Sequence, residues 1–401
     1  MKILIVSPFY APYSLVGANR MMSLSRCFVE KGHDVSVWAH DIKTLRSVSG
    51  EASLCSEVPE GVKTLRFSVS PESKSKWLYP FSYIRQLRQC RKAAKKQLYG
   101  NSFDLILMSC GPTYQQAAVL CYAKKHKISL VMDMRDMDVL ACKSESKNPL
   151  KRGAKNLFWY FWQYLPEKHC MKYASRAVFV VPGAAYDAVE AYGIPHKKTA
   201  VIYNGYDEVA GDSAALSDDG TLRVGLFGKL MLYSPERGAM LLEALELLNR
   251  SGIKAQLWHV GQQCRRAEEL IQVSRYSPDI YLALGPRDYP EGMALMRRAD
   301  ILAVEYLDPK GLGTKIFDYI SLNKPVVCVA PKDCALSRLT ASFENGFACD
   351  STEEIIDAIT KIIDQGLTVL DSNAELSVYS RKKQNEKYEK LLTEAAVKLK
   401  F

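Results

Sequence analysis

The 401-residue sequence lacks the patterns that mark several large protein classes. Its eleven cysteines include no C-x-x-C pair and no Cys/His spacing of the zinc type, which favours buried thiols over a metal site. No apolar run reaches the roughly 20 residues that a membrane-spanning helix needs. The first apolar segment, Ile3–Val6, is too short for a signal-peptide core and predicts a strand. We therefore expect a cytoplasmic protein, soluble or peripheral to a membrane, without a metal or other cofactor.

Acidic residues are scarce in the first half of the chain. Residues 1–200 carry 30 Lys and Arg against 15 Asp and Glu, whereas residues 201–401 carry 24 against 29. The whole chain has a formal net charge of +10, so the basic excess belongs to the first half. This asymmetry predicts an anionic partner for the first half alone.

Short β-branched runs alternate with amphipathic stretches twice along the chain. The first series predicts strands at 2–7, 35–39, 105–109, 129–133, 177–181 and 198–202, with a helix at 19–31. The second predicts strands at 222–227, 255–260, 280–282, 301–304 and 325–330, with helices at 238–249, 290–298 and 314–321. Two such series predict an α/β protein with two doubly wound, Rossmann-like domains.

A polar, small-residue stretch at 206–220 divides the two series and predicts a linker. We expect an N-terminal domain at 1–205, a C-terminal domain at 221–375, and a C-terminal helix within 376–401 that packs back towards the N-terminal domain. Ligands of such domains bind at the carboxyl ends of the strands, which makes the cleft between the domains the expected site.

The segment "KGLGTKIFD", residues 310–318, places two glycines, a lysine and an acid around a predicted helix start. Gly311 and Gly313 let the backbone approach a ligand, and a helix N-terminus favours phosphate. Lys315 adds a cation, and Asp318 could accept hydrogen bonds from vicinal hydroxyls. The alternative is an ordinary turn and cap with Asp318 on a solvated surface.

Three more loops follow predicted strands. In "GKLMLYSPERG" (228–238), Lys229 and Arg237 could clamp a diphosphate or could be solvated charges. In "VMDMRDMD" (131–138), three acids and an arginine gather where a site would be. The loop "SPFYAPYSLVGANR" (7–20) lacks the G-x-G-x-x-G pattern, so only Asp41 favours a dinucleotide.

Six segments, in order, resemble the retaining, nucleotide-sugar-dependent glycosyltransferases of the GT-B fold. They are the glycine loop after the first strand, "KGHDVSVW" (31–38), "VIYNGYD" (201–207), "GKLMLYSPERG", "RADILAVEY" (298–306) and "GLGTKIFDYISLNKPVV" (311–327). The resemblance covers nearly the whole chain and is strongest to family 4-like enzymes of bacterial surface-polysaccharide synthesis. It implies two Rossmann-like domains that face each other across a cleft.

The resemblance also implies roles for particular residues. Lys229 and Arg237 would neutralise the leaving diphosphate of a UDP- or GDP-linked sugar, although their spacing is wider than usual, and Asp318 would hold the ribose. The family carries a pair of glutamates here, and this chain departs from it with Lys310 at the first position. The other implied donor-binding residues are Gly17, Arg287, Gly311, Leu312, Gly313, Thr314 and Lys315.

No pair of carboxylates can be identified as the acid and nucleophile that a retaining hydrolase would need. The resemblance instead implies front-face transfer with retention, in which a donor phosphate oxygen takes the acceptor proton. Amides and cations would stabilise the leaving diphosphate without a metal. Asp136 is the candidate near the reacting sugar, and a structural bridge to Arg135 is the alternative. Asn19, Arg20, Asp133 and Arg135 are the candidates on the acceptor or sugar side.

Two segments, 74–99 and 151–172, mix Lys and Arg with aromatic residues. Such segments can lie on an anionic membrane surface, here the inner face of the cell membrane, and the alternative is a buried aromatic helix beside a basic one. No nucleic-acid motif is present. The sequence thus predicts a glycosyltransferase with a lipid-linked or oligosaccharide acceptor. A GT-B nucleotide-sugar epimerase and a non-catalytic nucleotide-sugar-binding subunit of an assembly complex are the alternatives.

Overall fold

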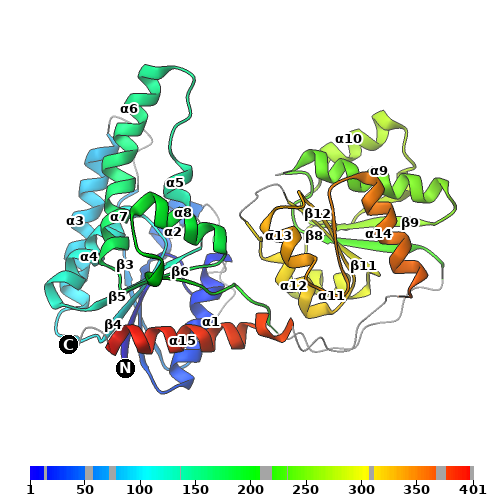
Figure 1. Cartoon of the computed structure of the whole chain (residues 1–401). Helices are drawn as coiled ribbons and strands as arrows, with labels where there is room; N and C mark the ends of the chain where they lie inside the picture. Colours follow the sequence, from blue (N-terminus) through cyan, green and yellow to red (C-terminus); the bar gives the residue numbers. More distant parts are fainter. Residues whose placement is uncertain are drawn as a thin grey trace. The chain divides into compact units, whose positions relative to one another are not determined.

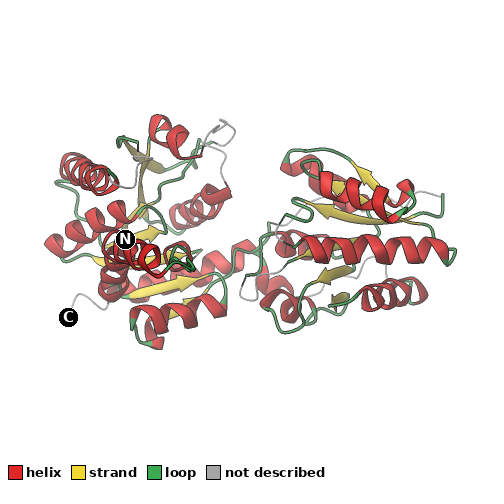
Figure 2. Cartoon of the chain, turned by 90° about the horizontal axis from the view of Figure 1, so that it is seen from above, coloured by secondary structure: helices red, strands yellow, loops and turns green. Residues whose placement is uncertain are grey.

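The computed structural model describes most of the chain, namely residues 1–12, 16–49, 57–71, 78–135, 137–207, 219–232, 234–306, 311–366 and 376–397. It divides into two compact units, Met1–Tyr203 with Gln384–Phe401, and Asn204–Lys383. Each unit is a parallel sheet with helices on both faces (Figures 1 and 2). The predicted pair of Rossmann-like domains is confirmed.

The first unit is built on a seven-stranded sheet in the order β3-β2-β1-β4-β5-β6-β7. Its strands are β1 (Lys2–Val6), β2 (Asp34–His40), β3 (Val62–Phe67), β4 (Leu105–Ser109), β5 (Ser129–Met134), β6 (Arg176–Phe179) and β7 (Thr199–Val201). Its helical elements are α1 (Val16–Glu30), α2 (Ile42–Ser49), α3 (Tyr79–Gln97), α4 (Thr113–His126), α5 (Asp138–Ala141), α6 (Pro149–Trp159), the π-helical turn η1 (Tyr160–Tyr164), α7 (Leu165–Tyr173), α8 (Pro182–Tyr192), η2 (His196–Lys198) and most of α15 (Arg381–Val397).

The second unit is built on a six-stranded sheet in the order β10-β9-β8-β11-β12-β13. Its strands are β8 (Leu222–Phe227), β9 (Ala255–Val260), β10 (Tyr281–Ala283), β11 (Ile301–Glu305), β12 (Val326–Val329) and β13 (Gly346–Cys349). Its helical elements are α9 (Pro235–Arg250), α10 (Arg265–Ser274), η3 (Pro278–Ile280), α11 (Tyr289–Arg298), α12 (Lys315–Leu322), α13 (Ala335–Thr340), α14 (Thr352–Asp364) and η4 (Leu376–Tyr379).

Each unit has its own core, which explains why both fold as compact bodies. Central strands buried on both faces are almost entirely apolar, as in β4 and β12, where every residue is buried. In the first unit, Tyr388 and Leu392 of α15 join the core around β1 and α1, so a segment from the end of the chain completes the N-terminal fold. Among the described helices, none is both long enough and apolar enough to cross a membrane.

The sequence missed two strands, and both lie at sheet edges. β3 is half-exposed along most of its length, and β13 is a four-residue strand that begins with Gly346. Edge strands bury less surface, so their sequences carry a weaker apolar pattern. The predicted linker lies mostly outside the described residues, at 208–218.

Candidate functional site

The carboxyl edge of the second sheet brings two of the predicted loops together. The ring of Phe227, the last residue of β8, lies 3.8 Å from the Lys315 ammonium at the start of α12. A Cβ added at Gly228 would lie 3.5 Å from Lys315 Cε, so the start of the loop after β8 passes close to this side chain. On α11, a Cβ at Gly292 would clash with the Phe227 ring at 2.3 Å, so that ring is held against the helix. The position of Lys315 is therefore fixed by packing.

Asp318 lies one turn into α12 and is only 7% exposed. Its Oδ1 accepts a hydrogen bond of 2.8 Å from the Tyr289 hydroxyl, and its Oδ2 lies 3.7 Å from Lys315 Nζ. The structure thus gives Asp318 two internal partners, and the predicted alternative of a solvated surface charge is wrong. Its contact with a ribose stays a prediction.

Burial opposes both charges of this pair. It raises the pKa of the Asp318 carboxyl, against the lowering effect of Lys315, and it lowers the pKa of the Lys315 ammonium, against the raising effect of Asp318. Burial and the neighbouring Asp318 raise the pKa of Tyr289 as well, so its hydroxyl remains a donor at neutral pH. Several groups with shifted pKa values at one sheet edge are typical of a binding or catalytic site.

Four of the other predicted donor residues, Gly311 to Thr314, directly precede α12, and Arg287 directly precedes the N-cap residue of α11. Leu312 is buried, whereas Gly313, Thr314 and Arg287 are exposed, and Gly311 is half-buried. Gly313 has a φ of 65°, in the left-handed region that favours glycine, and a Cβ there would meet open space. Thr314 precedes α12, so the helix N-terminus follows the glycine turn as predicted. Lys310 lies outside the described residues.

The loop that carries Lys229 has a feature that the sequence did not predict. Glu305, the last residue of β11, accepts a hydrogen bond from the Met231 N–H, and burial raises its pKa to about 7. Glu305 was overlooked because it ends an apolar strand and stands in none of the glycine-rich loops. Its place at a strand carboxyl end was the available signal.

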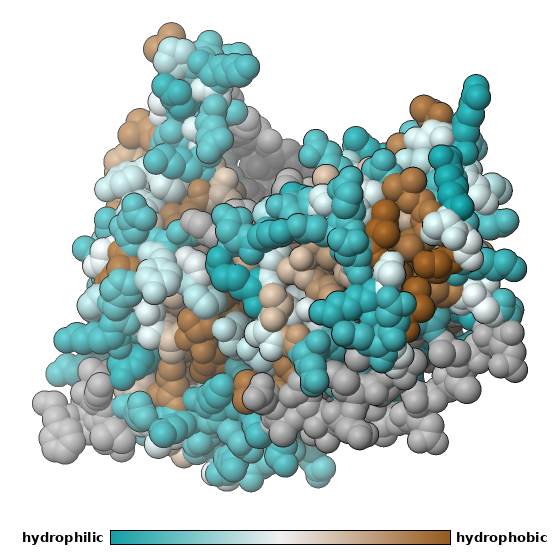
Figure 3. Space-filling model, turned by 45° about the vertical axis from the view of Figure 1, so that its right-hand side comes forward, coloured by the Kyte–Doolittle hydropathy of each residue, from teal (hydrophilic) through white to brown (hydrophobic). Residues whose placement is uncertain are grey.

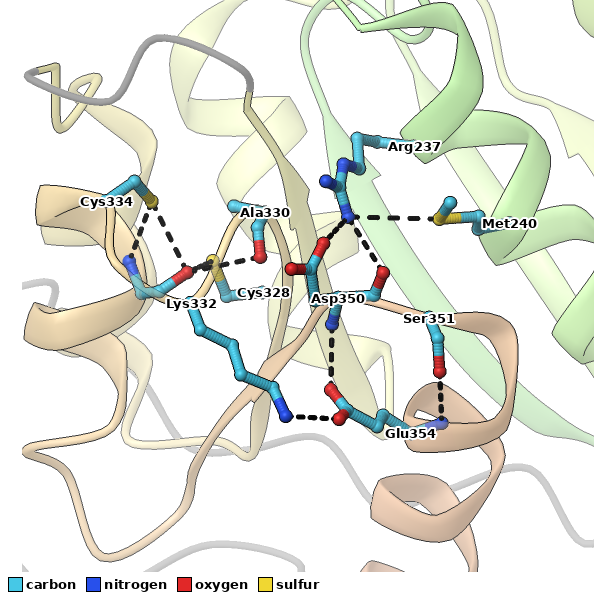
Figure 4. A network of polar contacts seen from close by, with 10 residues as sticks. Arg237, Met240, Cys328, Ala330, Lys332, Cys334, Asp350, Ser351 and Glu354 are labelled. Carbon is cyan, nitrogen blue, oxygen red and sulfur yellow. Dashed lines mark hydrogen bonds and ion pairs between the residues drawn. The ribbon is translucent and has the colours of Figure 1, made fainter.

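Arg237 forms an internal ion pair. It lies in the first turn of α9 and contacts the Asp350 carboxylate, and it also donates to the Asp350 carbonyl at 3.0 Å (Figure 4). The Asp350 N–H donates to Glu354 Oε2 at 2.9 Å, and Glu354 in turn pairs with Lys332. The network joins the start of α9 to the start of α14. A role of Arg237 towards a diphosphate would require it to exchange partners.

In the first unit, Arg20 and Asp133 form a buried ion pair. Arg20 Nη2 lies 3.1 Å from Asp133 Oδ1, and the two side chains are 7% and 0% exposed. Arg20 also donates to the carbonyls of Ile202 and Tyr203, and the Tyr388 hydroxyl donates to Asp133 Oδ1 at 2.9 Å. These contacts connect α1, β5 and α15, and they give the acid an internal partner where we had expected a substrate to supply one.

The remaining candidates of the first unit lie on α1 and just after β5. Asn19 is exposed on α1, Gly17 belongs to the first turn of that helix, and Arg135 is half-buried just after β5. Asp136 lies outside the described residues, so its role stays a prediction. Across the ranges that the structure describes, no group of three or more His, Cys, Asp or Glu is placed to hold a metal ion.

The two basic aromatic segments form neighbouring helices. Tyr79 of α3 and Phe158 of α6 have ring centroids 4.8 Å apart, and Tyr83 and Trp162 have theirs 5.1 Å apart. Other apolar side chains of the same segments point outwards, with Phe81 71%, Leu157 62% and Phe161 53% exposed. The segments therefore divide their aromatic residues between an inner packing face and an outer one.

Two family models match the chain, one mostly over the first unit and one within the second. Residues 17–209 match Glycosyltransferase Family 4, and residues 221–365 match Glycosyl transferases group 1. No curated protein matches the sequence.

Solved structures share the fold over the whole length. The Anabaena protein HepE, in complex with UDP and glucose, is 18% identical with a TM-score of 0.62, over 98% of this chain and 100% of that one. A glycosyltransferase from Rickettsia africae is 14% identical with a TM-score of 0.65, over 98% of each chain. The lipopolysaccharide outer core galactosyltransferase WaaB, in its apo form, is 12% identical with a TM-score of 0.63, over 100% of each. At these identities the likeness establishes the GT-B fold.

Proposed function

We propose that this chain, which matches a family 4 glycosyltransferase model over residues 17–209 and a group 1 model over residues 221–365, is a glycosyltransferase, and we propose its donor and its acceptor. The donor is a UDP- or GDP-linked sugar bound to the second unit. The acceptor is a lipid-linked or oligosaccharide glycan bound to the first unit. Transfer proceeds with retention and without a metal, in the synthesis of a bacterial surface polysaccharide. The protein is cytoplasmic and docks on the inner face of the membrane.

The observation that carries the donor assignment is the pair Lys315–Asp318 at the N-terminus of α12. A nucleotide diphosphate sugar needs cations and amides for its phosphates and an acceptor for its ribose hydroxyls. The fixed Lys315 ammonium and the helix N-terminus supply the first, and the Asp318 carboxylate supplies the second. HepE, a neighbour in fold, has been crystallised with UDP-glucose, which supports a nucleotide-sugar donor here.

The chemistry follows from where charge develops. As the bond from the sugar to the diphosphate breaks, negative charge grows on the leaving phosphate oxygens. Positive groups already held in place stabilise that charge without having to reorganise. Lys315 is such a group, because Phe227 and Asp318 restrain it before a ligand arrives. In front-face transfer, an oxygen of the same diphosphate takes the acceptor proton, so no protein base is required.

A donor panel tests this function. The full-length protein is incubated with UDP- and GDP-linked sugars, with and without glycan acceptors extracted from bacterial membranes, and the products are identified by mass spectrometry. We expect release of one nucleoside diphosphate and an acceptor heavier by one sugar. Formation of an epimeric nucleotide sugar without acceptor would favour the epimerase alternative. Binding without turnover would favour a non-catalytic subunit.

The outer face of α3 and α6 supports the membrane part of the proposal. Figure 3 shows hydrophobic residues beside hydrophilic ones on the projecting end of the first unit, and α6 extends beyond the sheet in Figure 1. Exposed apolar side chains such as Phe81 and Leu157 share these helices with exposed cations. The cations are Arg85, Arg88, Arg91, Lys92, Lys95 and Lys96 of α3 and Lys151, Arg152 and Lys155 of α6. Cations and outward aromatics together suit an anionic lipid surface.

A further inference from the structure

The segment Gly228–Leu232, here called the donor loop, is held by side chains from three other elements. His259 Nε2 lies 2.9 Å from the Gly228 carbonyl, the Cys264 thiol donates to the Leu230 carbonyl at 3.3 Å, and the Met231 N–H donates to Glu305. The Tyr281 hydroxyl lies 2.9 Å from His259 Nδ1, and burial lowers the pKa of that imidazole. His259 is therefore neutral, with its proton on Nε2, and donates to the loop.

The tether from Glu305 acts where the loop is under strain. Met231 has a φ of 58°, in the left-handed region that a methionine adopts at a conformational cost. Gly238 leaves room for this arrangement, because a Cβ there would lie 2.5 Å from Met231 Cγ and 2.7 Å from Glu305 Oε2. The start of α9, at Gly238, thus packs closely against both Met231 and Glu305. The bond to Glu305 holds the N–H of the strained residue itself, whereas the bonds from His259 and Cys264 hold Gly228 and Leu230.

A second carboxylate, in a hydrogen bond similar to that of Glu305, lies at the other end of β11. Asp300, just before the strand, accepts a hydrogen bond of 2.6 Å from the Arg223 N–H, as Glu305 does from Met231. In both residues the second carboxylate oxygen is buried and has no partner among the described residues, and burial raises the pKa of both. Asp300 lies at the amino edge of the sheet and Glu305 at the carboxyl edge. Only Glu305 is therefore placed to affect a ligand of the carboxyl edge.

We propose that Glu305 is a positioning residue that fixes the donor loop so that Lys229 and the loop amides meet the donor diphosphate; this rests on the proposed function. Lys229 is exposed and lies two residues before Met231. A lysine side chain is long and flexible, and the position of its backbone sets the region that its ammonium can reach. Losing the Glu305 tether would enlarge the space that Lys229 samples without removing any group that touches the substrate.

Calorimetry with UDP and GDP on the full-length protein tests the role, with Glu305→Ala, Glu305→Gln and Asp300→Ala compared. We expect E305A to weaken binding of the preferred nucleotide about tenfold and to raise the donor KM more than it lowers kcat. E305Q keeps an oxygen that can accept from Met231, so its affinity should stay within about threefold of wild type. D300A removes the matched carboxylate and should leave affinity within about twofold, whatever it does to thermal stability.

A double-mutant cycle with Lys229→Ala separates positioning from general destabilisation. If Glu305 acts through Lys229, E305A should have less than a threefold effect on affinity in the K229A background. Glu305→Asp, which withdraws the carboxylate by one methylene, replaces E305A should that variant fail to fold. Wild-type affinity in E305A or E305D would overturn the role, as would equal losses in D300A and E305A. Wild-type protein that binds neither nucleotide would overturn the proposed function itself, and the inference with it.

Discussion

Single residues at the carboxyl edge of the second sheet are held by internal partners before any ligand is bound. Lys315 lies against the Phe227 ring, and Asp318 faces both Lys315 and the Tyr289 hydroxyl. Because burial disfavours both charges, a ligand that adds phosphate beside Lys315 and hydroxyl donors beside Asp318 would stabilise the ionised forms of both. The arrangement is prepared for a ligand with an anionic end and a polyol next to it.

Asp318→Asn is expected to weaken UDP or GDP binding about tenfold while the protein stays folded. The amide is a poorer acceptor for ribose hydroxyls than the carboxylate, and it no longer offsets the charge of Lys315. Calorimetry with the nucleotide alone measures the change, and Asp364→Asn, at an exposed position of α14, is the control. Unchanged affinity would limit Asp318 to a structural role as the partner of Lys315 and Tyr289.

His40 gives the first unit a specific sensitivity to acid. It is 1% exposed at the end of β2, between the rings of Phe67 and Tyr114, and burial lowers its pKa to about 4. In the unfolded chain this histidine binds a proton near pH 6.5, whereas in the folded chain it stays neutral until the pH approaches 4. The contribution of His40 to the free energy of unfolding is therefore fully present above pH 6.5 and is lost as the pH falls towards 4. Between pH 7 and pH 5 the loss from this group is about 2 kcal/mol.

Urea unfolding at these two pH values checks this expectation. His40→Gln should reduce the difference in unfolding free energy between pH 7 and pH 5, because the variant has no group to protonate there. His126→Gln, at an exposed position of α4, should leave the difference as it is in the wild type. Equal acid sensitivity in all three proteins would show that His40 does not cause it.

The residues that the sequence could identify are those in loops with unusual composition. Gly313, Lys315 and Asp318 were predicted as site residues because glycines, a cation and an acid stand close together after a predicted strand. Their partners were not found, since Phe227 and Tyr289 are ordinary aromatic residues in sequence and meet Lys315 only through the fold. Glu305 escaped notice for the same reason, because its neighbours in sequence are apolar strand residues.

For helices and strands too, the sequence predicts the elements themselves but not the contacts between distant ones. Central strands such as β1 and β12 were predicted because both faces are buried, so nearly every residue is apolar. The contact of Arg20 on α1 with Asp133 on β5 joins residues 113 positions apart, and Tyr388 reaches Asp133 across 255. Local pattern cannot show such pairs. The sequence therefore proposed a substrate role for Arg20 and Asp133, whereas the structure also gives them a role in holding α15.

The two residues predicted to clamp the diphosphate lie in the donor loop and in the first turn of α9. Lys229→Ala and Arg237→Ala are each expected to cost about 2–4 kcal/mol in transition-state stabilisation, comparable to losing one oxyanion donor. For Arg237 this requires exchange of Asp350 for the donor, since the two are paired in the structure (Figure 4). Steady-state rates with the donor identified by mass spectrometry give kcat/KM for each variant.

The comparison of Asp350→Asn with Arg237→Ala distinguishes the two roles open to Arg237. If Arg237 serves the diphosphate, weakening its internal partner should keep or raise donor affinity, whereas R237A lowers it. If Arg237 serves only to join α9 to α14, both variants should lower thermal stability and leave donor affinity unchanged. Activity of K229A and R237A within twofold of the wild type would remove both residues from the clamp.

Over the whole molecule, the boundary between the basic and the acidic half of the sequence lies close to the boundary between the two units. The basic excess belongs to residues 1–200, within the first unit, and the second half of the chain is slightly acidic. A nucleotide needs only a local group of cations, such as Lys315 at the start of α12. A membrane surface is an extended polyanion and is met best by many cations on one unit, as the exposed Lys and Arg of α3 and α6 provide.

We therefore expect the protein to sediment with anionic liposomes and much less with neutral ones. Each Lys or Arg near such a surface contributes about 1 kcal/mol at low salt, and inserted apolar side chains such as Phe81 and Leu157 add burial. Salt should release the protein only in part, because it screens charge and leaves the apolar contact intact.

Replacing the cations of these helices by glutamine tests the surface itself. The set Lys92, Lys95, Lys96, Lys151, Arg152 and Lys155 should abolish sedimentation and spare nucleotide binding. An equal number of exposed lysines elsewhere in the first unit, replaced in the same way, provides the control: Lys31, Lys43, Lys63, Lys125, Lys127 and Lys197. Because both variants lose the same net charge, only a localised surface predicts a difference between them. Equal loss in both would point to non-specific attraction, and a wild type that ignores anionic vesicles at low salt would favour a soluble acceptor.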